Sequence, residues 1–143
     1  MGKFRQFMAI AAVATLAVLG LGAAPASAAM VITKACDGGP FYYPNVDATM
    51  KVCVQYNGTQ INGVADVVTG AGALTIGVEV WQCNANLCGE LLPPASQNVP
   101  AHTHQFVATT LYPAARGHSY VALLLVNGGV VSSTDPLAVP CPC

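Results

Sequence analysis

The sequence predicts a single all-β domain, an immunoglobulin-like antiparallel β-sandwich held together by disulfides. Three observations lead to this fold class. Apolar and polar residues alternate with a period of two over most of the chain after residue 28. Turn signals such as Asn57-Gly58 and Gly70-Ala71-Gly72 interrupt the alternation at short intervals. Six cysteines in 143 residues are typical of a disulfide framework. A short up-and-down barrel is the alternative architecture.

About seven strands are expected along the chain. They cover residues 31–35, 50–56, 64–68, 74–81, 106–112, 118–126 and 130–134. In the second of them, Val52, Val54 and Tyr56 share one face, and Asn57-Gly58 then turns the chain back. In the third, Val64, Asp66 and Val68 alternate with two other apolar residues before the glycine-rich break.

The fourth expected strand carries the clearest apolar stripe, which consists of Leu74, Ile76, Val78 and Val80. This stripe should face the core and turn Trp81 the other way. The fifth strand is rich in β-branched and aromatic residues, and the sixth is apolar on both faces, as expected of a central strand. Asn127-Gly128-Gly129 turns the chain into the seventh. Prolines at 93, 94 and 100 predict a loop or an extended edge over residues 92–101.

Residues 1–28 have the three parts of a secretory signal peptide. Lys3 and Arg5 supply positive charge, residues 7–22 are uncharged and mostly apolar, and Ala26-Ser27-Ala28 is an A-x-A cleavage site. A membrane anchor is less well supported, because the apolar run is short and ends in small residues. We therefore expect a secreted protein whose single domain covers residues 29–143, begins at Ala29 and has no membrane span after cleavage.

The charge of the expected domain excludes several classes of function. After residue 28 only three Lys and Arg remain, against six Asp and Glu, so the domain cannot neutralise a run of nucleic-acid phosphates. The sequence contains neither a G-x-S-x-G nucleophile motif nor an H-E-x-x-H zinc motif. We expect no enzymatic activity and no cofactor.

The cysteines are expected to form a stapled scaffold. Cys83 and Cys88 should pair with each other, because only four residues separate them. The better solutions for the other four tie Cys141 and Cys143 separately to Cys36 and Cys53, which would fasten the C-terminal tail to the first strands. The alternative pairs Cys36 with Cys53 and leaves Cys141-Pro142-Cys143 as a dithiol for redox chemistry or a soft metal such as Cu(I).

The histidines raise the question of a metal site. If the segment around Thr103 is extended, His102 and His104 lie on one face, and a third ligand would complete a site for zinc or copper. His118 is the only other histidine, and no Asp or Glu lies close in sequence. We interpret His102 and His104 as exposed loop residues and predict no metal site.

Aromatic residues are the candidate interface. Trp81 should lie on the face opposite the core stripe, where an exposed Trp in a surface poor in charge is a typical interface anchor. The alternative is that Trp81 packs beneath the Cys83–Cys88 loop. Tyr42 and Tyr43, between two prolines, are expected in a loop that either binds a partner or covers the core.

Residues 78–83, V-E-V-W-Q-C, lead into the short cysteine loop, and residues 117–124, G-H-S-Y-V-A-L-L, form the expected central strand. With the Ala-rich leader, these features resemble small secreted β-sandwich proteins of actinobacteria without assigned function. More distantly, the chain is similar to carrier proteins of the neocarzinostatin type, although those lack a third pair of cysteines and a Cys-rich tail. The resemblance implies the sandwich fold and carries over no ligand-contacting residue.

Low charge, rigid bridges and exposed aromatics favour an extracellular, non-enzymatic module that binds another protein or the cell envelope. Two alternatives remain open. A small-molecule carrier would hold its ligand in an apolar cleft at one end of the sandwich. A secreted protease inhibitor would present residues 91–99 or 84–87 as a rigid loop.

Overall fold

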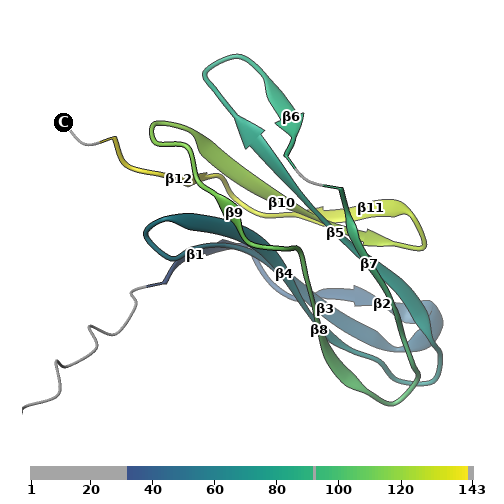
Figure 1. Ribbon diagram of the computed structural model, residues 1–143. Coiled ribbons are helices and arrows are strands. Elements are labelled where there is room, and N and C mark those ends of the chain that lie inside the picture. Colours follow the sequence, from purple (N-terminus) through teal and green to yellow (C-terminus); the bar gives the residue numbers. More distant parts are fainter. Residues whose placement is uncertain (1–31, 92, 142–143) are drawn as a thin grey trace, which may run out of the picture.

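The computed structural model describes residues 32–91 and 93–141, which form two antiparallel sheets packed face to face (Figure 1). We refer to them as sheet I and sheet II. The prediction of an all-β antiparallel sandwich is confirmed. The predicted signal peptide, residues 1–28, and the expected mature start at Ala29 lie outside the described residues.

Sheet I has the strand order β1-β3-β4-β8, and in addition β2 pairs with β3 and β9 pairs with β4. Its strands are β1 (Thr33–Cys36), β2 (Phe41–Tyr43), β3 (Ala48–Tyr56), β4 (Gln60–Val68), β8 (His104–Ala108) and β9 (Tyr112–Pro113). A 3-10 turn, η1 (Pro44–Val46), connects β2 to β3. The β3–β4 hairpin turns at Asn57-Gly58, where Gly58 has φ 98°, as the sequence predicted.

Sheet II has the strand order β11-β10-β5-β6, and in addition β12 pairs with β10 and β7 pairs with β5. Its strands are β5 (Leu74–Cys83), β6 (Cys88–Glu90), β7 (Ala95–Val99), β10 (Ser119–Val126), β11 (Gly129–Ser133) and β12 (Leu137–Ala138). The chain passes from sheet I to sheet II between β4 and β5, returns between β7 and β8, and crosses again before β10.

The core lies between the two sheets and is built from alternate residues of the long strands. The predicted stripe of β5 is buried along its whole length, and alternate residues of β3, β4 and β10 face it. These inward residues are Met50, Val52, Val54, Ile61, Ala65, Val67, Leu74, Ile76, Val78, Val80, Tyr120, Ala122, Leu124 and Val126. Because alternate residues face inward, the residues between them form the two outer faces of the sandwich.

Two local predictions were wrong. The strand expected over 106–112 is divided into β8 and β9, because four steps from Ala108 to Tyr112 oppose only three from Val64 to Ile61 on β4. The extra residue forms a bulge, where the Thr109 hydroxyl accepts the amide hydrogen of Gly63 at 3.0 Å. The segment containing the two adjacent tyrosines is strand β2 and not a loop, because it pairs with the beginning of β3.

The segment over residues 92–101 contains strand β7, which among the described strands pairs with β5 alone. It is therefore an extended edge, which was one of the two forms predicted from its prolines.

Tyr120 fastens the loop that leads into β10. Its side chain is fully buried, and its hydroxyl accepts the Ala115 amide hydrogen at 2.6 Å. A tyrosine near the start of a strand that bonds a backbone group a few residues upstream is the arrangement called a tyrosine corner in immunoglobulin-like sandwiches. The immunoglobulin-like topology itself stays a prediction.

Within residues 32–91 and 93–141, no helix has the length and apolar character needed to cross a bilayer.

Candidate binding groove

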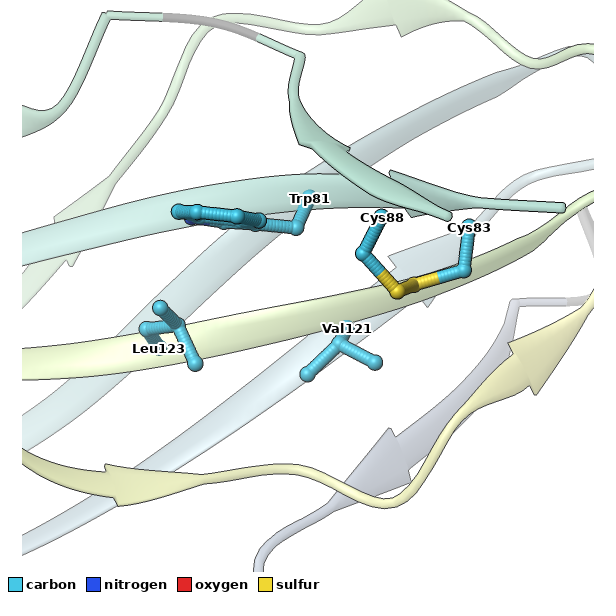
Figure 2. Close-up of a pocket in the computed structure, with 5 residues that line it drawn as sticks. All are labelled: Trp81, Cys83, Cys88, Val121 and Leu123. Atoms are coloured by element: carbon cyan, nitrogen blue, oxygen red, sulfur yellow. A yellow bond between two sulfur atoms is a disulfide. The ribbon is translucent and has the colours of Figure 1, made fainter. Parts of the chain in front are cut away.

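The outer face of sheet II contains an apolar groove of about 200 Å³. Five residues line it: Trp81, Cys83, Cys88, Val121 and Leu123. Figure 2 shows Trp81 and the Cys83–Cys88 disulfide on β5 and β6, beside Val121 and Leu123 on the neighbouring strand β10. No charged side chain is among the described residues that line the groove.

Strand register brings the lining residues together. Trp81 lies directly opposite Val121, and Glu79 lies opposite Leu123. All four alternate with buried core residues, so they point outward from sheet II. Except for Cys88 on β6, the groove therefore consists of outward residues of β5 and β10, whose inward residues form the core.

Trp81 is held in place by its own strand. Its indole Nε1 donates a hydrogen bond to Glu79 Oε2 at 3.0 Å, and the side chain is half-buried. Because the one polar atom of the indole is already bonded, the rest of the ring offers an apolar surface. This agrees with the prediction that Trp81 faces away from the core, and the disulfide lies beside it.

The short disulfide forms as expected, and the preferred long-range pairing was wrong. Cys83 pairs with Cys88, whereas Cys36 pairs with Cys53, which was the alternative pairing, and not with the C-terminal tail. The reason is register, because Cys36 lies directly opposite Cys53 where β1 pairs with β3. Cys141 is an exposed free thiol, and Cys143 lies outside the described residues.

The two candidate tyrosines do not form one surface with each other or with Trp81. As neighbours in a strand they point to opposite sides of sheet I, so Tyr43 packs against the core and Tyr42 is exposed. The Tyr42 hydroxyl donates to Asp47 Oδ1 at 3.0 Å. This hydrogen bond and the negative charge of Asp47 raise the pKa of Tyr42 above its ordinary value.

The histidines do not form the arrangement that an extended segment would have produced. His102 lies in a turn with φ 56°, so it is not in line with His104. His104 Nε2 lies 2.6 Å from Asp66 Oδ1, and its ring lies 5.2 Å from that of Phe106. His118 Nδ1 lies 3.1 Å from Gln82 Nε2. Within the described residues, no group of three His, Cys, Asp or Glu side chains could hold a metal ion.

Sequence reasoning missed the residues that complete the groove. Val121 and Leu123 belong to the strand recognised as apolar on both faces, and that pattern was the available signal for a covered outer face. The pattern did not indicate which strand lies beside this one, so neither residue could be assigned to the same surface as Trp81.

A second, larger hollow of about 620 Å³ lies near the C-terminal end of the described chain. Polar and apolar groups line it, including Asn84, His118 and Cys141. A third, of about 270 Å³, lies on the outer face of sheet I around the Cys36–Cys53 disulfide.

No protein-family model matches the chain, and no curated protein sequence or solved structure is significantly similar to it. The function must therefore be inferred from the geometry of these surfaces.

Proposed function

We propose that the protein is a secreted, non-enzymatic binding module that engages another protein through the groove beside Trp81. The observation that carries the proposal is an apolar hollow on the outer face of a sheet, floored by a disulfide and two aliphatic side chains. An exposed apolar surface of this kind is typical of an interaction site. Two disulfides in a small domain support an oxidising, extracellular location.

The size of the groove favours a protein partner. Sites for drug-sized ligands usually have volumes of about 300–1,000 Å³. At about 200 Å³ the groove is smaller than that range and suits one inserted side chain. Interfaces commonly place such an anchor in a pocket lined by aromatic and aliphatic groups.

The groove is also well ordered before binding. Its residues come from paired strands, and the disulfide joins two directly opposite positions. Little free energy is therefore needed to order the site when a partner binds, and this favours affinity.

A small-molecule carrier is the second candidate, and the 620 Å³ hollow favours it. Its volume lies within the usual range for small ligands, and its lining includes the last residue of β5 and the first residue of β10. Its mixed polar lining suits a ligand that has both polar and apolar groups.

A protease inhibitor is less well supported. Residues 95–99 of the suggested loop form β7 and are paired with β5, so they are not free to enter a protease cleft. The other candidate loop, residues 84–87, is held rigid by the Cys83–Cys88 disulfide and by a hydrogen bond from the Leu87 amide to Asn84 Oδ1 at 3.1 Å, as an inhibitor requires, but it contains only four residues.

Affinity capture with Trp81→Ala tests the proposal. The tagged protein, with its disulfides intact, is incubated with culture supernatant and envelope extract of the producing organism, and retained molecules are identified by mass spectrometry. We expect one stoichiometric protein partner whose binding weakens by about tenfold or more in the variant. Leu87→Ala is the control, because Leu87 is 74% exposed but does not line the groove.

If a Trp81→Ala variant with a native circular dichroism spectrum binds as strongly as the wild type, the groove is not the binding site. A retained small molecule with no protein partner would instead favour the carrier.

A further inference from the structure

The outer faces of the two sheets resemble each other in construction. Each carries a disulfide between directly opposite residues of neighbouring strands. Each also carries a large aromatic side chain: Trp81 lines the groove on sheet II, and Phe106 lines the hollow on sheet I. The two aromatic side chains differ in exposure. Trp81 is half-buried in a recess, whereas Phe106 is 63% exposed and projects outward.

The two faces differ in the sign of their charge. On sheet I, Lys34 and Lys51 both line the hollow beside Phe106. The same hollow also contains one carboxylate, Asp66, which lies directly opposite Lys51 and whose Oδ1 lies 2.6 Å from His104 Nε2. Neither lysine forms an ion pair with any described residue, and the two lysines outnumber this carboxylate. We call this surface the basic face.

The outer surface of sheet II is acidic. Glu79 accepts the indole hydrogen of Trp81, and Glu90 lies directly opposite Trp81 on β6, where it is exposed. The strands of sheet II, all of them within the described chain, contain no Lys, Arg or His. We call this surface, with its groove, the acidic face.

From these observations we infer that the protein partner of the Trp81 groove is a second copy of this chain, which docks its basic face against the acidic face of the first. The inference rests on the proposed function, because it names the occupant of the same groove. Phe106 of one copy supplies the side chain that enters the groove of the other. Lys34 and Lys51 then lie against a surface whose charged groups are carboxylates.

The geometry makes this association open-ended. The basic and acidic faces are different surfaces on opposite sides of one sandwich, so the contact is heterologous and each docked copy still presents a free face. Copies would therefore add in a row and would not close into a two-fold dimer.

The area of the faces limits the strength of the association. A four-stranded face with nine-residue strands measures about 30 Å by 19 Å, or roughly 600 Å². Stable interfaces usually bury about 800 Å² on each partner, so this contact is expected to be weak and to depend on concentration. Because opposite charges contribute, it should also weaken as salt is added.

Sedimentation analysis of the purified protein, with both disulfides formed, tests the inference. At low salt the weight-average mass should rise with protein concentration beyond that of two copies, and it should fall when salt is added. Phe106→Ser and Trp81→Ala should each weaken association by about tenfold or more. Leu87→Ser should leave it unchanged, because this exposed side chain lines neither the groove on sheet II nor the hollow on sheet I. Phe106 and Trp81 both lie outside the core, and circular dichroism checks that the variants fold.

Mixing the two variants gives the decisive result. Phe106→Ser keeps an intact acidic face and Trp81→Ala keeps an intact basic face, so an equimolar mixture should form pairs that cannot grow further. If Trp81→Ala does not fold, Glu90→Lys replaces it, because that exposed position reverses the charge of the acidic face.

A wild-type protein that stays monomeric at all concentrations would overturn the inference, as would a mixture that stays monomeric while the wild type associates. The proposed function is tested separately. A different protein, retained by the wild type and by Phe106→Ser but lost with Trp81→Ala, would overturn self-association and leave the groove as a binding site. If no Trp81-dependent binding of any kind occurs, both fail.

Discussion

Replacing Gly63 by alanine measures how closely the two sheets are packed. Gly63 lies on the inner face of β4, and a Cβ atom added there would lie 2.8 Å from Val78 Cγ1 and 2.9 Å from Val80 Cγ2. Both distances are shorter than a van der Waals contact. Valine side chains are stiff at χ1, so these methyl groups cannot rotate out of the way without strain.

Two effects oppose each other in this substitution. Alanine in a strand is usually about 0.5–1 kcal/mol more stable than glycine, because glycine loses more backbone entropy on folding. Overpacking a well-filled core costs about 1–3 kcal/mol. Since the contacts come from the opposite sheet, we expect the overpacking to dominate. The free energy of unfolding should fall by about 1–2 kcal/mol, and the melting temperature should fall by roughly 4–8 °C.

Gly89→Ala is the matched control. Gly89 also lies in a strand, but a Cβ atom there would meet nothing within 4 Å. This variant should be as stable as the wild type or slightly more so. Urea unfolding followed by far-ultraviolet circular dichroism, with disulfides intact, measures both variants.

A second substitution tests the cause. Val78→Ala removes one of the two contacted side chains, so it should cost less stability in the Gly63→Ala background than in the wild type, with a coupling of about 1 kcal/mol. If Gly63→Ala and Gly89→Ala have equal stability, the reasoning about sheet spacing is refuted.

Three further predictions concern the scaffold. Replacing both cysteines of the β1–β3 disulfide by serine should lower the free energy of unfolding by about 3 kcal/mol, and the same change in the β5–β6 disulfide should lower it by about 2 kcal/mol. The β1–β3 disulfide closes the longer loop, because its cysteines are 17 residues apart and those of β5–β6 are 5 apart. Urea unfolding that gives the reverse order would contradict this prediction. Tyr120→Phe should cost about 1–2 kcal/mol with no change in the denaturant slope, because a backbone amide loses its acceptor; unchanged stability would show that water replaces the contact. Asp47→Asn should lower the pKa of Tyr42 toward its ordinary value, because the charge that opposes loss of the hydroxyl proton is removed. Absorbance titration in the two proteins measures this shift, and coincident curves would exclude the contact with Asp47.

Much of the fold could be predicted because its signals are local. The β5 stripe, the Asn57-Gly58 turn and the short cysteine loop each lie within a few residues of one another, so steric preferences and side-chain alternation are enough to identify them. The bulge between β8 and β9 was missed because it depends on how those segments align with β4, and the segments themselves carry no signal for that alignment.

The candidate site was predicted in part. Trp81 could be assigned to an outer face from alternation alone. The other groove residues could not be assigned to the same surface, because alternation specifies the side of a strand and not its neighbour. The contact between His104 and Asp66 was missed for the same reason, since 38 residues separate the two side chains.

The sequence by itself determined the class of structure, the direction in which most strand residues point and the pairing of Cys83 with Cys88, since each follows from spacing along the chain. Only the tertiary structure decided the rest. Strand order placed Cys36 opposite Cys53 and grouped Trp81 with Val121. It also brought Lys34 and Lys51 together on one outer face and Glu90 beside Trp81 on the other. The physical reason is that register between distant strands is a property of the packed core as a whole, in which every strand must bury its apolar face at once.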